Sequence, residues 1–258
     1  MRAANSRKEV TLASAHDMRM VSATPEDDPT WRSLYKVGGV AALIVAVLTP
    51  IQVILFIGWP PPSSVIGYFT LFQNSRLLGL LDLDLLMIFD EVLMVPLLLA
   101  LYVALRRSSQ SFMLIATTLG LIAVALYCVS REATFTMSAL SDQYAAATTE
   151  AQRSIFLAAG QTMLAIYNGT AFDTYYILGA VGGLITAAVM LRSNTFSKVT
   201  AYVGLVMSAL MLVPPTAGMP GLLLSLLSLV PMVLWLILIT RRLLKLGEGV
   251  SKVGVSPN

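Results

Sequence analysis

The sequence predicts an all-α fold: a polytopic membrane helical bundle with six transmembrane helices and one outer-face amphipathic or re-entrant helix. Of the 258 residues, 57% are hydrophobic and 12% are charged, about half the charge of an average soluble domain. Apolar runs of about 20 residues recur along the chain, and a helix needs this length to cross a bilayer. The composition excludes a soluble domain, a disordered chain and a nucleic-acid-binding protein.

Six apolar runs are expected to span the membrane. In chain order they are Val37–Ile57, Leu85–Leu105, Phe112–Val129, Thr174–Leu191, Val199–Val213 and Met219–Thr240. The first is followed by Trp59 and three prolines, Pro60 to Pro62; proline stops a helix, and tryptophan suits the membrane interface. The fifth run is short for a spanning helix.

The stretch Ser154–Ala171 is a seventh candidate, but the distribution of basic residues favours six spans. With six spans and a cytoplasmic N-terminus, three of the 17 Lys and Arg residues lie outside, namely Arg76, Arg131 and Arg153. This asymmetry follows the positive-inside rule, whereas a seventh span would divide the basic residues almost evenly. We therefore expect both termini in the cytoplasm.

The long connection between the third and fourth spans carries the signals of a further helix. Thr149-Glu150-Ala151-Gln152 fits a capping box, and Asn168-Gly169 fits a turn. These signals predict an outer-face helix over Glu150–Tyr167, either lying along the membrane surface or dipping into the membrane and returning. The polar residues 1–33 are expected to form a disordered cytoplasmic tail, residues 34–246 the membrane domain, and residues 247–258 a second cytoplasmic tail.

Two adjacent carboxylates, Asp90 and Glu91, interrupt the second apolar run. A carboxylate at the centre of a spanning helix costs roughly 2.5–3.5 kcal/mol. Counting back from Arg106, where the run reaches the inner surface, places both residues about 6–8 Å inside the outer boundary of the hydrocarbon core. The sequence therefore predicts a polar cavity open to the outside, with both carboxylates at its floor and Arg131 as their counter-charge.

Other polar residues near the outer boundary are candidates for the same cavity. They are Glu132, Asp173, Gln161 and Asn168, with Tyr167, Tyr175 and Tyr176 as neutral hydrogen-bonding groups. Each has a structural alternative. Asp82, Asp84 and Asp173 fit solvated residues near helix starts, where a negative charge suits the helix dipole. Arg131 and Glu132 fit an interface pair that ends the third span, and Asp90 and Glu91 fit a structural ion pair. The glycines Gly179 and Gly183 fit close helix packing.

The residue types and motifs that the sequence lacks limit the reactions and binding sites that can be expected of it. The chain has one cysteine, Cys128, and one histidine, His16, so we expect no metal site, no cofactor and no disulfide scaffold. Neither HExxH nor a nucleotide-binding glycine motif occurs, and no lysine lies within a span. Carboxylate chemistry remains: proton exchange, cation binding or acid–base catalysis by Glu91 and Glu132.

Two regions of the sequence resemble a family of small prokaryotic membrane proteins. The stretches that carry the resemblance are Gln143–Arg153 with Ala165–Phe172, and Val189–Ser193 with Phe196–Gly204. That family has about six spans and is classed as a domain of unknown function. The resemblance covers Lys36–Leu246 and implies the same architecture and a prokaryotic cell membrane. The family has no established activity, so no catalytic role carries over.

Three functions stay open at this point. The first is a membrane protein that binds or translocates a proton, a small cation or a small polar ligand through the outward-facing cavity. The second is a non-enzymatic assembly subunit whose buried carboxylates pair with an unidentified membrane protein partner. The third is an intramembrane enzyme that uses carboxylates on a lipid-soluble substrate. In each case the lipid bilayer is the surrounding partner.

Overall fold

The computed structural model describes residues 29–80 and 84–249, and these residues form helices and connecting turns with no strand. The all-α class is therefore confirmed. After a short 3-10 helix, η2 (Pro29–Trp31), the helices are α2 (Arg32–Gly58), α3 (Val65–Leu80), α4 (Leu86–Leu105), α5 (Gln110–Ala146), α6 (Glu150–Tyr167), α7 (Thr170–Arg192), α8 (Lys198–Leu210) and α9 (Gly218–Glu248). The expected tails lie mostly outside the described residues, although α2 already begins at Arg32 and α9 continues to Glu248.

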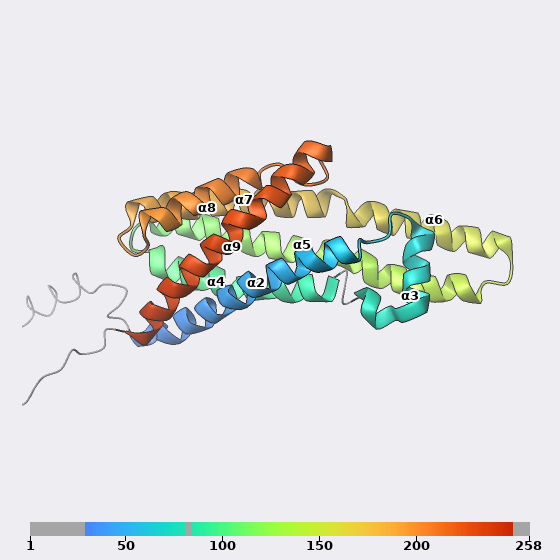
Figure 1. Cartoon of the computed structure of the whole chain (residues 1–258), viewed down its shortest axis with the longest axis horizontal. Helices are drawn as coiled ribbons and strands as arrows, with labels where there is room; N and C mark the ends of the chain where they lie inside the picture. The colour runs from blue at the N-terminus through green and yellow to red at the C-terminus, as the bar shows by residue number, and fades with distance from the viewer. Residues whose placement is uncertain (1–28, 81–83, 250–258) are drawn as a thin grey trace, which may run out of the picture.

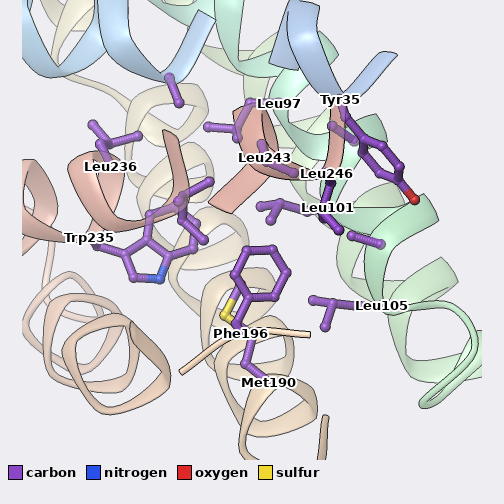
Figure 2. Packing of buried hydrophobic residues seen from close by; sticks show 14 of the residues in the cluster. Tyr35, Leu97, Leu101, Leu105, Met190, Phe196, Trp235, Leu236, Leu243 and Leu246 are labelled. Atoms are coloured by element: carbon purple, nitrogen blue, oxygen red, sulfur yellow. The ribbon is translucent and has the colours of Figure 1, made fainter. Parts of the chain in front are cut away.

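The apolar helices pack side by side in one bundle (Figure 1). Helix α2 contacts α4 and α9, α7 contacts α5 and α8, and α8 contacts α9. Figure 2 shows the apolar core at the end of the bundle where α2 begins and α4 ends, with side chains of α2, α4 and α9 gathered around Phe196. Helix α4 contributes three leucines to this core, Leu97, Leu101 and Leu105, and each is at most 2% exposed.

Five stretches are long and apolar enough to cross a membrane, as far as the described part of the chain extends. They are α2, α4, α5, α6 together with α7, and α9. Helix α8, which contains most of the fifth expected span, has 13 residues and is about 20 Å long, less than the roughly 30 Å hydrocarbon core. The polytopic membrane architecture is confirmed, but the count of six spans is not.

Both ends of the membrane domain lie at the same end of the bundle (Figure 1). A Cβ on Gly247, near the end of α9, would lie 3.2 Å from the backbone oxygen of Arg32 at the start of α2. The chain therefore traverses the bundle an even number of times, and this requires α8 to count as one traverse despite its length.

Helix α5 is much longer than the expected third span. It has 37 residues and is about 55 Å long, so nearly half of it extends beyond a 30 Å hydrocarbon core. The helix itself does not end at Arg131 and Glu132, where the third span was expected to end, but continues unbroken to Ala146. We call residues 130–146 of α5, together with α3 and α6, the projecting module (Figure 1).

Helix α6 has the predicted bounds but not the predicted position. Thr149 Oγ1 accepts a hydrogen bond from Gln152 N at 3.2 Å, which begins the helix as the capping signal indicated. The helix neither lies flat against the bundle end nor re-enters it; it runs alongside the projecting half of α5 (Figure 1). The physical reason is α3, which was not predicted. Tyr68 and Phe72 of α3 are buried against Met137 of α5, with Met163 of α6 packed beside them.

Small residues allow the closest helix contacts. A Cβ on Gly38 of α2 would lie 2.5 Å from Ala100 Cβ and 2.9 Å from the Pro96 oxygen of α4. A Cβ on Gly182 would lie 3.0 Å from the Ala116 oxygen of α5, and Gly183 faces Ser208 of α8. Gly179 has open space around it. The packing interpretation of the Gly179–Gly183 spacing therefore holds for Gly183 and not for Gly179.

Candidate functional site

Asp90 and Glu91 lie near the start of α4 and face two different helices. Glu91 Oε1 accepts a hydrogen bond from the Tyr175 hydroxyl of α7. Asp90 Oδ2 accepts one from Gln52 Nε2 of α2 at 3.3 Å, and the same amide lies 3.5 Å from the Leu86 oxygen. Adjacent helical residues point about 100° apart, which is why one carboxylate reaches α2 and the other reaches α7.

Both carboxylates have neutral partners. Among the described residues, neither Asp90 nor Glu91 belongs to an ion pair. Asp90 Oδ1 is buried and has no hydrogen-bond partner in that part of the chain. A buried carboxylate that keeps its charge without a cation is costly, so this pair favours the binding of a proton or a small cation.

Aromatic rings surround the Glu91–Tyr175 hydrogen bond. The Tyr175 ring centroid lies 4.8 Å from that of Tyr127 on α5 and 5.4 Å from that of Tyr176. Phe172, one turn earlier on α7, lies 5.2 Å from Tyr176. Ring pairs at these separations gain energy beyond the burial of their area. The cluster therefore holds the Tyr175 ring in place beside Glu91.

Arg131 lies on the other side of the same ring cluster. Its side chain is 4% exposed, and its guanidinium carbon lies 4.0 Å from the ring centroid of Tyr167, 4.8 Å from that of Tyr127 and 4.9 Å from that of Phe172. A guanidinium within about 6 Å of an aromatic face is stabilised by a cation–π interaction. Three rings from α5, α6 and α7 thus enclose one cation.

The ion-pair partner of Arg131 is Asp84, just before α4. Arg131 Nη1 lies 3.5 Å from Asp84 Oδ1, and Asp84 is fully buried. Two expectations are therefore wrong: Asp84 is not a solvated residue at a helix start, and Arg131 is not paired with Asp90 or Glu91. Burial raises the pKa of the Asp84 carboxyl above its ordinary value, and the Thr134 and Arg131 side chains offset part of this increase. Burial likewise raises the pKa of the neighbouring Tyr68 phenol.

The structure brings only some of the predicted candidates together. Tyr127 connects the two parts of the site, because its ring contacts both Arg131 and Tyr175, the partner of Glu91. Glu132, Gln161 and Asn168 are exposed and lie outside this cluster. Asp173 is half-buried in the first turn of α7 and accepts a hydrogen bond from Thr216.

The sequence contained signals for the residues that were missed. Tyr127 precedes Arg131 by four residues, so both lie on one face once α5 is known to continue through Arg131. Asp84 and Glu91 are seven residues apart and share a face of the same helical register. Neither signal was decisive, because the third span was expected to end at Arg131.

In the part of the chain that the structure describes, no three His, Cys, Asp or Glu side chains lie close enough together to hold a metal ion. Cys128 is a half-buried free thiol.

Residues 34–247 match one protein family, whose description is "Domain of unknown function (DUF4386)". The match covers almost the same residues as the resemblance found in the sequence, which is thereby confirmed. No curated protein and no solved structure matches the chain.

Proposed function

The chain belongs to the DUF4386 family, a domain of unknown function, and we propose that it is a proton-binding protein of a prokaryotic cell membrane. In this proposal Asp90 and Glu91 take up and release a proton from the outer side. Both termini lie in the cytoplasm, and the projecting module faces outward. The orientation rests on the positive-inside rule, since Arg106, Arg107, Arg241 and Arg242 all lie at the opposite end from that module.

The observation that carries the proposal is the partner set of the two carboxylates. Each accepts a hydrogen bond from a neutral donor, Gln52 or Tyr175, and Asp90 keeps one buried oxygen without a partner. A proton on that oxygen would remove the charge and supply a donor. An ion pair that served only structure would instead leave each carboxylate beside a basic group, as Asp84 lies beside Arg131.

The depth of the site favours binding from one side over passage through the membrane. Asp90 and Glu91 lie four and five residues after the first residue of α4, about 6–8 Å along the helix. Towards the other end, Leu97, Leu101 and Leu105 of α4 pack into the apolar core (Figure 2). Residues 97–105 contain no carboxylate, lysine, arginine or histidine that could pass a proton onward.

Proton binding would change the contact between α4 and α7. An ionised Glu91 accepts a strong, charge-assisted hydrogen bond from Tyr175, and a protonated Glu91 accepts a weaker one. Tyr175 packs on Tyr127, which in turn packs on Arg131. A shift of Tyr175 would therefore change the packing around Arg131 at the base of the projecting module. The proposed function is therefore a response to external pH.

A proton count tests this proposal. The full-length protein in weakly buffered detergent is brought from about pH 5.5 to about pH 9, a range above the ordinary titration of exposed carboxyls, and the released protons are measured with an indicator dye. We expect the variant Asp90→Asn/Glu91→Gln to release fewer protons per chain than the native protein, by one proton for each carboxyl of the coupled pair that ionises within this range.

The matched control is Glu150→Gln, whose carboxylate is 90% exposed. This variant should release as many protons as the native protein over the same range, because it keeps both Asp90 and Glu91. Equal proton release from the native protein and the double variant would overturn the proposal.

A further inference from the structure

An apolar groove lies between α2 and α4, nearer the start of α2 than the Gln52–Asp90 contact between the same two helices. Its volume is about 280 Å³. Its walls are formed by Val37, Val40, Ala41 and Ile44 of α2, and by Leu93 and Pro96 of α4. Val37 and Val40 are 55% and 47% exposed, so the groove opens onto the surface that faces the membrane.

One end of the groove carries a positive charge. Lys36 lines this end and is the one charged residue in the lining; its side chain is exposed. Arg32 lies one turn earlier on the same side of α2, and its Nε is buried without a hydrogen-bond partner in the described part of the chain. Arg106, directly after α4, lies 5.0 Å from the ring of Trp31, which immediately precedes α2. All three basic residues thus lie at this end of the bundle, but Lys36 is the one that lines the groove, and the Arg32 guanidinium lies against Gly249 after α9.

The dimensions of the groove match one leaflet of a bilayer. Lys36 and Ile44 are eight residues apart on α2, a distance of about 12 Å. Half of a 30 Å hydrocarbon core is about 15 Å. A chain that begins at the headgroup level beside Lys36 and follows the groove would thus pass through most of one leaflet.

We propose that this groove is a binding site for an anionic phospholipid. The lipid phosphate pairs with Lys36, with Arg32 adding positive charge, and one acyl chain fills the space between Val40, Ile44 and Leu93. Charge complementarity selects an anionic headgroup, because a zwitterionic lipid carries a cation that the basic cluster repels. The groove is independent of Asp90 and Glu91, so this inference does not rest on the proposed proton binding.

Lipid-dependent stability of the full-length protein in detergent tests the headgroup. Added phosphatidylglycerol should raise the Tm of the native protein more than the same amount of phosphatidylcholine. In Lys36→Gln the difference between the two lipids should disappear. The matched control is Lys245→Gln, an exposed lysine near the end of α9 that does not line the groove; this variant should keep the full difference. Equal losses in both lysine variants would contradict the proposal, because they would indicate a diffuse attraction to the basic end of the bundle.

A second pair of variants tests the acyl chain. Val40→Phe fills the groove, whereas Val47→Phe adds the same bulk to an α2 residue that is 53% exposed and lies outside it. Native mass spectrometry should detect a retained phosphatidylglycerol molecule in the native protein and in Val47→Phe, and its loss in Val40→Phe. Inorganic phosphate at matched concentration should leave the Tm of the native protein unchanged. Retention of the lipid in Val40→Phe, or stabilisation by phosphate alone, would overturn the proposal.

Discussion

Arg131 is a buried cation that is stabilised by cation–π contacts with three rings and by an ion pair with one carboxylate. The guanidinium lies against Tyr127, Tyr167 and Phe172 and pairs with Asp84 at 3.5 Å. Its Nε also donates to Ser130 Oγ at 3.2 Å. These contacts join the segment before α4 to the turn between α6 and α7, so the residue fixes the base of the projecting module to the bundle.

Replacing Arg131 with glutamine should destabilise the protein by about 3–5 kcal/mol, because the change leaves Asp84 buried without a counter-charge. Unfolding in detergent, followed by circular dichroism, measures the effect. Arg76→Gln is the matched control, since Arg76 pairs with Asp142 in a half-exposed site and its loss should cost no more than about 1 kcal/mol. Similar losses in the two variants would contradict this account of Arg131.

At the scale of elements, α2 and α4 approach each other closely at Gly38. Any side chain there meets Ala100 Cβ and the backbone oxygen of Pro96, at 2.5 Å and 2.9 Å from a Cβ. The backbone of α4 cannot yield as a flexible side chain would, so the two helices must separate. That separation would disturb the position of Gln52 against Asp90, the contact between the same two helices further along α2.

Gly38→Ala should therefore lower the unfolding free energy by about 1–3 kcal/mol, the usual cost of overpacking. Gly179→Ala, also within a helix but with nothing within 4 Å of its Cβ, should leave stability unchanged or raise it by up to about 1 kcal/mol, because alanine favours helix over glycine. Chemical unfolding of both variants checks the contrast. A Gly38→Ala protein as stable as Gly179→Ala would show that the helices are not in tight contact there.

The elements differ in how far sequence could predict them. The bounds of α6 followed from local signals, the Thr149 cap and the turn at Asn168-Gly169. Helix α3 was not predicted, because its apolar residues become a buried face only when Tyr68 and Phe72 meet Met137 of α5. The span expected from the sequence stops at Val129, well before the end of α5, because in the sequence a buried Arg131 looks the same as an arginine that ends a span. The tertiary partners that make the burial of this arginine possible, Asp84 and three rings, cannot be recognised from local sequence.

At the scale of the whole molecule, the structure combines an apolar bundle with a projecting module (Figure 1). The polar site lies where they meet, because Tyr127 contacts both Tyr175 of the bundle and Arg131 at the base of the module. The positions of Asp90 and Glu91 within a span could be predicted from the cost of burying charge. Of their partners, Tyr175 was expected only as one of three tyrosines near the cavity, and Gln52 was not predicted, because both come from helices whose rotation the sequence leaves free. The same limit explains why Arg131 was assigned to the wrong carboxylates.

Cysteine labelling should place the module and the opposite end of the bundle on different sides of the membrane. In a Cys128→Ala background, Gln143→Cys lies in the exposed projecting half of α5, and Ser108→Cys lies in the exposed turn between α4 and α5. A membrane-impermeant maleimide should label the first in intact cells and the second only after permeabilisation. The reverse pattern would place the polar site in the inner leaflet and exclude its access to external protons.

We propose that a carboxyl group of the Asp90–Glu91 pair carries a proton inside the membrane at neutral pH. Infrared spectroscopy of the protein in lipid at pH 7 observes this proton directly through the carbonyl stretch of an un-ionised carboxyl. We predict that the native protein and Glu150→Gln both show the band, and that Asp90→Asn/Glu91→Gln lacks it. A band of unchanged intensity in the double variant, or no band in the native protein, would contradict the claim.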